Sequence, residues 1–222
     1  KYLEAGADII ETNTFSSTTV SMADYHVEEY VREMNLAAVK LARDLADEYT
    51  AKNPDKPRFV AGSVGPTNKT CSMSPDVNNP AYRALSYDEL AASYQQQMEA
   101  MLEGGVDAIL IETIFDTLNA KAAIFAAEQA MKATGVEVPV MLSVTVSDIG
   151  GRTLSGQTLD AFLASVQHAN IFSVGLNCSF GARQLKPFLE QLAARAPYYI
   201  SAYPNAGLPN SLGKYDQTPA DM

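Results

Sequence analysis

The sequence predicts an α/β fold, a TIM (β/α)8 barrel truncated at both ends with about six βα units present. Short, nearly continuous apolar runs alternate with segments whose apolar residues recur at helical spacing. This strict alternation indicates parallel strands joined by right-handed crossovers. Most of the apolar runs also end in polar residues, as strands do at the mouth of a barrel enzyme, where the active site lies.

The predicted strands are rich in apolar residues along their whole length, which is typical of strands buried on both faces. An open doubly wound sheet is the alternative architecture. No G-x-G-x-x-G segment follows the first run, so the dinucleotide-binding fingerprint of that sheet is missing and the barrel is favoured. The predicted strands are Asp8–Phe15, Arg58–Val64, Asp107–Thr113, Val138–Ser147, Ile171–Cys178 and Tyr198–Tyr203.

Helices are predicted between these strands from spacing and capping residues. Ser86 followed by Glu89 forms a capping box, and Asp116 is a suitable N-cap for the next helix. The other predicted helices are Asp24–Lys52, Leu159–His168 and Arg183–Arg195.

The two ends of the chain resemble cut elements. Tyr2–Gly6 has the pattern of a last helical turn ending at glycine, and Thr218–Met222 that of a first helical turn. We therefore expect residues 1–222 to be one partial barrel domain of a longer polypeptide, without the first and last strands of the barrel.

Composition excludes several classes of function. The net charge is -10, and the lysines and arginines form no basic stripe, so nucleic-acid binding is not expected. No apolar run approaches the roughly 18 residues of a membrane span. The 2 cysteines are too few for a disulfide framework and fit a reducing compartment, which predicts a cytoplasmic protein.

Cys178 is the first candidate for chemistry, because it ends a predicted strand. Three interpretations remain open: a small core residue, a nucleophile, or a metal thiolate. The nucleophile is poorly supported, because His26 and His168 both lie on predicted helices and neither ends a strand. Zinc needs four ligands, and the chain has no C-x-x-C or H-x-x-x-H spacing.

Polar residues near the other strand ends are candidates for binding a substrate. Glu112 ends the most apolar strand, where it either pairs with a cationic side chain or receives a substrate ammonium group. Asp116 either assists Glu112 in binding the ammonium group or caps the helix that follows it. Ser143 heads a row of hydroxyls that either fill space or donate to a substrate carboxylate.

Several motifs, in this order along the chain, resemble the homocysteine-binding domain of cobalamin-dependent methionine synthases. The resemblance covers nearly the whole chain, and it also extends to homocysteine methyltransferases that use betaine or S-methylmethionine. The Phe115–Asn119 and Asn205–Pro209 segments look more like the cobalamin branch. The motifs are Gly6–Phe15, Gly65–Asn68, Ile111–Lys121, Gly151–Thr158, Gly175–Cys178 and Pro204–Pro209.

The resemblance implies a zinc site of three cysteine thiolates, of which Cys178 matches the one in a Gly-x-Asn-Cys strand end. The other two belong to a Gly-Gly-Cys-Cys segment that this chain lacks, so the other ligands would lie outside it. Homocysteine would bind as a zinc thiolate and attack methylcobalamin, giving methionine. Cobalamin and methyltetrahydrofolate would be bound by other domains of the same polypeptide. Glu112 would receive the amino group, and the full set of expected homocysteine-binding residues is Glu112, Asn177, Ser143, Asp116 and Asn13.

Two alternatives to this function stay open. One is a homocysteine methyltransferase that uses a sulfonium or betaine methyl donor without cobalamin. The other is a non-catalytic amino-acid-binding barrel, which would need no zinc.

Overall fold

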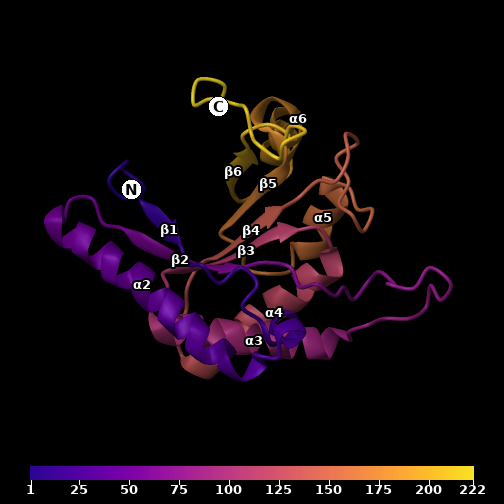
Figure 1. The fold of residues 1–222 in the computed structure, drawn as a ribbon, viewed down its shortest axis with the longest axis horizontal. Coiled ribbons are helices and arrows are strands. Elements are labelled where there is room, and N and C mark those ends of the chain that lie inside the picture. Colours follow the sequence, from indigo (N-terminus) through magenta and orange to yellow (C-terminus); the bar gives the residue numbers. More distant parts are fainter. The chain divides into compact units, whose positions relative to one another are not determined.

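The computed structural model describes residues 1–222, and its strands form one six-stranded sheet in the order β1-β2-β3-β4-β5-β6 (Figure 1). The strand order follows the chain without a reversal, as in a (β/α) barrel and unlike a doubly wound sheet. The predicted fold class is therefore confirmed: the chain is an α/β protein with the topology of a truncated TIM-like barrel. The strands are β1 (Ile9–Glu11), β2 (Phe59–Val64), β3 (Ala108–Ile114), β4 (Val140–Val144), β5 (Ser173–Gly181) and β6 (Tyr199–Asn205).

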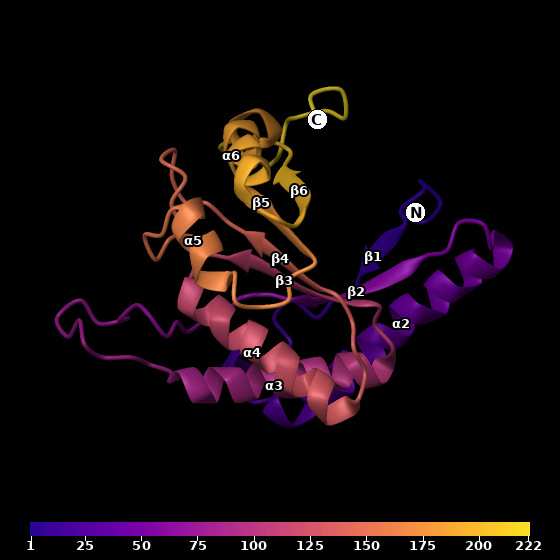
Figure 2. The same cartoon turned by 180° about the vertical axis from the view of Figure 1, so that it is seen from behind.

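Helices follow the strands in turn (Figure 2), and none is long and apolar enough to cross a membrane. The α-helices are α1 (Thr19–Met22), α2 (Val31–Lys52), α3 (Tyr87–Gly104), α4 (Thr117–Thr134), α5 (Leu159–Val166) and α6 (Ala182–Arg195).

The helix predicted from Asp24 to Lys52 begins later than expected. Residues Ala23–Tyr25 and Glu28–Tyr30 form two short 3-10 turns, and α2 starts only at Val31. His26 lies between the two turns with a left-handed φ of 55°, which interrupts the helical hydrogen-bond ladder. The prediction was wrong for this stretch, and His26 is not within a helix.

The chain divides into two compact units. The first consists of Lys1–Ile111 with Leu118–Val140, and the second of Glu112–Thr117 with Met141–Met222. Whether residues 1–222 act as one partial domain stays a prediction.

In the first unit, α2 and α3 pack beside each other and against β2. The predicted capping box is present at the start of α3: the Ser86 hydroxyl accepts from the Glu89 amide, and the Glu89 carboxylate accepts from the Ser86 amide. The Ser86 hydroxyl and the Ser86 amide both donate to the Glu89 carboxylate, and these two hydrogen bonds hold the pKa of that carboxyl below its ordinary value. At the other end, Gly105 takes a φ of 92° and caps α3, a position that favours glycine.

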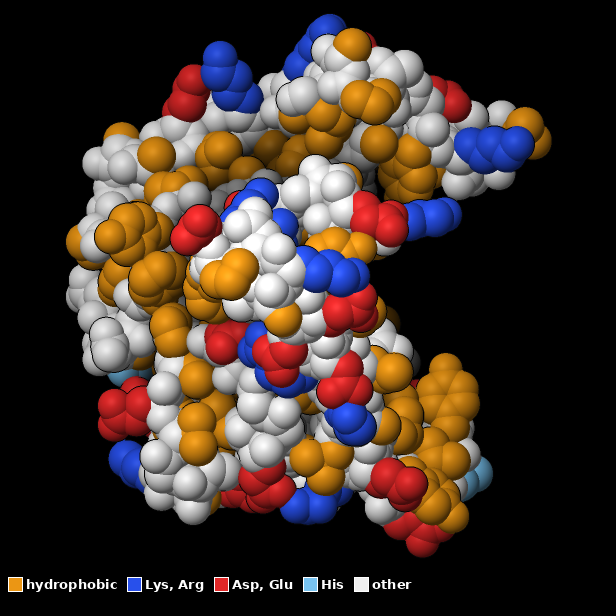
Figure 3. Space-filling model, turned by 90° about the vertical axis from the view of Figure 1, so that its left-hand side faces the viewer, with side chains coloured by type: hydrophobic (Ala, Val, Ile, Leu, Met, Phe, Trp, Pro, Cys, Tyr) orange, Lys and Arg blue, Asp and Glu red, His pale blue; other side chains and the backbone are white.

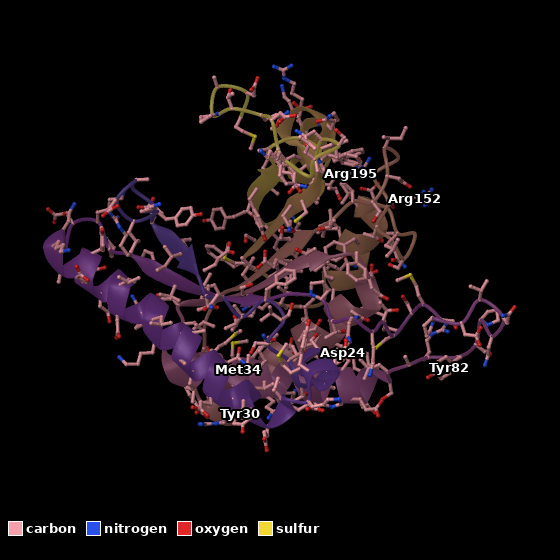
Figure 4. The ribbon with its side chains drawn as sticks, viewed as in Figure 1. Asp24, Tyr30, Met34, Tyr82, Arg152 and Arg195 are labelled. Carbon is pink, nitrogen blue, oxygen red and sulfur yellow. The ribbon has the colours of Figure 1, made fainter.

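One side of α2 carries apolar residues that stay exposed. Tyr30, directly before α2, and Met34 lie one turn apart (Figure 4), and Leu41 is 64% exposed further along the helix. The view of Figure 3 shows apolar side chains scattered among charges of both signs on the side that it faces. Scattered exposed apolar residues of this kind are ordinary on protein surfaces.

In the second unit, β5 and β6 run unusually close at Gly175. A Cβ atom on Gly175 would lie 2.1 Å from the Ser201 hydroxyl oxygen and 2.2 Å from the Ser201 carbonyl oxygen. Only glycine fits this approach, because the obstructing atoms include backbone that cannot swing aside.

Gly175→Ala should therefore destabilise the protein by about 1–3 kcal/mol, because β6 must move away from β5. The denaturant midpoint measures this. Gly150→Ala is the control, since its added carbon would meet only the tip of the Asp148 side chain, at 3.2 Å. Equal midpoints for the wild type and Gly175→Ala would contradict the close approach.

Candidate functional site

The candidate site lies in the second unit, at the carboxyl ends of β3, β4 and β5, and Asn177 is at its centre. This side chain is 1% exposed. Its Oδ1 accepts hydrogen bonds from the Ser143 hydroxyl at 2.7 Å and from the Thr113 amide at 3.1 Å. Its Nδ2 donates to Thr113 Oγ1 at 2.8 Å and to Cys178 Sγ at 3.1 Å. Every donor and acceptor of the amide is used, so Asn177 joins three strand ends in one fixed arrangement.

The backbone around Asn177 is strained. Thr113, Cys178 and Ser179 have φ values of 55°, 60° and 59°. Left-handed backbone is uncommon for residues other than glycine, and it is costly for a β-branched threonine. His26 is the one other non-glycine residue with a positive φ, so this strain is concentrated at the site.

The strain at Cys178 accompanies an irregularity in β5. The pairing of β5 with β6 shifts register between Asn177 and Gly181, as at a β-bulge. The Thr145 hydroxyl donates to the Asn177 carbonyl at 3.2 Å, and the Ser179 hydroxyl donates to the Val146 carbonyl. A bulge changes the local course of the backbone, and Cys178 lies inside this irregular stretch.

Cys178 is a free, half-buried thiol, and the structure gives it no histidine partner. Its hydrogen bond is to Asn177. His168 precedes the amino end of β5, whereas Cys178 lies near the carboxyl end of the same strand. A Cys–His nucleophilic pair is therefore not formed at this strand end.

The residues of this chain supply one candidate thiolate for a metal, and no group of three or more His, Cys, Asp or Glu side chains that could hold one. Cys178 suits a ligand, because it is half-buried at a strand end and its backbone is held by neighbouring hydrogen bonds. Cys71 is buried in the first unit, where its amide donates to Asn119 Oδ1 at 2.9 Å. A tetrahedral zinc site would need further ligands besides Cys178.

Glu112 is 7% exposed at the end of β3, as predicted for a strand-end carboxylate. The Tyr203 hydroxyl, on β6, donates a hydrogen bond to Glu112 Oε2 at 3.1 Å. Tyr203 was not among the site residues predicted from the sequence. The polar Tyr203–Asn205 segment at the end of a predicted strand could have indicated it. Glu112 is also next in sequence to Thr113, so it is tied to Asn177 through the backbone.

The other predicted residues have different surroundings. Ser143 is fully buried, and its one hydroxyl proton goes to Asn177. Asp116 is 1% exposed directly before α4, where a capping role and a substrate role both stay open. Asn13 is exposed in the loop after β1, in the first unit, and its role stays a prediction.

A hydroxyl cluster that the sequence did not reveal holds the glycine-rich loop after β4. Gln157 Oε1 accepts from the Thr117 hydroxyl at 2.9 Å and from the Ser155 hydroxyl. The Ser155 amide donates to the Phe115 carbonyl at 3.1 Å. Arg152 lies on the same loop (Figure 4), which is therefore pinned to the segment that follows β3.

Fold and site together define a protein of the TIM-barrel class with a strained, hydrogen-bonded cysteine at a strand end. The family model for homocysteine S-methyltransferase matches residues 1–222. The chain belongs to this family.

Solved structures of the homocysteine methyltransferase MmuM from Escherichia coli share the fold. The metallated form is 23% identical, with a TM-score of 0.76 over 93% of this chain and 69% of that one. The oxidised form, also 23% identical, has a TM-score of 0.75 over 92% of this chain and 68% of that one. The apo form, again 23% identical, has a TM-score of 0.69 over the same shares.

Proposed function

We propose that this chain is the homocysteine-binding part of an enzyme that transfers a methyl group to the sulfur of homocysteine, giving methionine. One observation carries the proposal. The Asn177 amide connects the Cys178 sulfur to Thr113, and Thr113 directly follows Glu112. A candidate thiolate and a carboxylate suited to an ammonium group are thus joined through one rigid network.

In this proposal the chain's residues bind and orient the amino acid. Glu112 receives the ammonium group, and its low exposure strengthens a charged contact there. Asn177 fixes Cys178 and Thr113 relative to each other, and Ser143 holds Asn177 from β4. Asp116 and Asn13 are further proposed contacts with homocysteine.

Cys178 is proposed as one ligand of a zinc ion whose other ligands lie outside this chain. Zinc, when bound, lowers the pKa of a coordinating thiol, so that homocysteine is present as the nucleophilic thiolate. The Asn177 Nδ2 hydrogen bond to Cys178 Sγ suits this role, because it is a donor that stabilises a sulfur anion.

For the methyl donor we propose methylcobalamin, carried on another domain of a longer polypeptide that also binds methyltetrahydrofolate. The Phe115–Asn119 and Asn205–Pro209 segments support this choice through their resemblance to the cobalamin branch. A sulfonium or betaine donor is the competing proposal, because family membership fits it equally well. Methyl transfer assays of the full-length protein with each donor decide between them. Cytoplasmic location is part of the proposal.

Glu112→Gln tests the proposed ammonium site. In the full-length protein, this change should weaken homocysteine binding by about ten- to a hundredfold, because it removes a charged hydrogen bond. Zinc content should not change, since Glu112 is not a proposed ligand. Calorimetry with homocysteine and elemental analysis measure the two quantities. Unchanged affinity in a folded variant would assign Glu112 to a structural role.

A further inference from the structure

Tyr203 and Glu112 meet although they are far apart in the sequence. The phenol oxygen of Tyr203 donates to Glu112 Oε2 at 3.1 Å. In the sheet, Tyr203 on β6 pairs with Asn177 on β5, so the backbone of Tyr203 lies beside the residue at the centre of the candidate site. Its side chain is half-buried, and from this position it reaches to the end of β3.

We propose that Tyr203 is a positioning residue that orients the Glu112 carboxylate to receive the ammonium group of the substrate. The inference rests on the proposed function. A free glutamate side chain samples several rotamers, and fixing one of its oxygens reduces the entropy that substrate binding would otherwise cost. A phenol carries no charge, so it holds the carboxylate without neutralising it, unlike a lysine or arginine.

The hydrogen bond from Tyr203 has a consequence for specificity. Tyr203 acts through Glu112 Oε2, and in this proposal Glu112 contacts only the ammonium group of the ligand. Tyr203 should therefore favour thiols that carry an α-ammonium group over thiols of the same length without one. Its contribution should disappear when either the ammonium group or the Glu112 charge is absent.

The experiment uses the full-length protein and two ligands, L-homocysteine and 4-mercaptobutanoate, which lacks the amino group. Tyr203→Phe should weaken homocysteine binding about three- to tenfold and leave 4-mercaptobutanoate binding unchanged. Tyr199→Phe is the matched control on the same strand. Tyr199 is 71% exposed, and its ring lies 5.0 Å from that of Phe172, so this change should affect neither ligand.

A double-mutant cycle completes the test. In a Glu112→Gln background, Tyr203→Phe should cause no further loss of homocysteine affinity, because its partner charge is gone. Equal weakening of both ligands, or an additive loss in the double variant, would overturn the positioning role. So would unchanged affinity of Tyr203→Phe in a protein whose wild type binds homocysteine. If the wild type does not bind homocysteine at all, the proposed function fails, and the role of Tyr203 fails with it.

Discussion

Cys178→Ser in the full-length protein should lower zinc content to well below one ion per chain and abolish methyl transfer to homocysteine. A neutral hydroxyl is a poor replacement for a thiolate on a borderline-soft ion, so the variant loses both properties together. Serine is close to cysteine in volume, and the fold should be retained. Elemental analysis after dialysis and a methyl transfer assay measure the two losses.

The outcome also separates the three interpretations of Cys178. A nucleophile would lose turnover and keep its metal, and a core residue would keep both. Cys71→Ser is the matched control, because Cys71 is the other free cysteine and lies buried in the first unit. It should retain zinc and activity. Full zinc occupancy and normal methyl transfer in Cys178→Ser would refute the ligand role.

Asn177→Ala should have the second largest effect, on local stability and on homocysteine binding together. The change leaves the buried Ser143 hydroxyl and the Thr113 amide without the acceptor that they share. Leaving buried donors unpaired costs about 1–3 kcal/mol each, so a loss of about 2–6 kcal/mol is expected for the two. The strained backbone at Cys178 should relax as well, since its neighbour no longer holds it.

Hydrogen–deuterium exchange of peptides from β5 and β6 measures this loss, because exchange reports local opening. The peptides should exchange faster in the variant, while those from α2 and α3 should not change. Asn78→Ala, in an exposed loop of the first unit, is the control and should leave all of them unchanged. If Asn177→Ala changes neither the exchange of the β5 peptides nor the affinity for homocysteine, the hydrogen bonds of Asn177 neither stabilise β5 nor support binding.

The strands were predictable because each one is a local pattern. Each of the six expected runs overlaps one strand, although β3, β5 and β6 extend past the predicted ends, and the capping box at Ser86 starts its helix as expected. Hydrogen bonds between strands were not predictable in this way, because they depend on register. Thr113 and Asn177 are 64 residues apart, and Glu112 and Tyr203 are 91 apart. No spacing in the sequence identifies such pairs.

The strained backbone was also hidden from the sequence. A left-handed φ at Thr113, Cys178 or Ser179 contradicts the preferences of these residue types, so it exists only because the surrounding structure imposes it. The left-handed backbone of His26 was hidden in the same way. Periodicity predicted a helix from Asp24, but α2 begins only at Val31. At Cys178, this departure from local preference coincides with the residue proposed for chemistry.

The most direct test of the proposed function is a crystal structure of the full-length protein with L-homocysteine bound. We expect the ammonium nitrogen about 2.7–3.2 Å from a Glu112 carboxylate oxygen. We also expect Cys178 Sγ and the homocysteine sulfur on the same zinc ion, each at about 2.3 Å. Homocysteine bound away from the carboxyl ends of β3 and β5, or a metal site that excludes Cys178, would contradict this account.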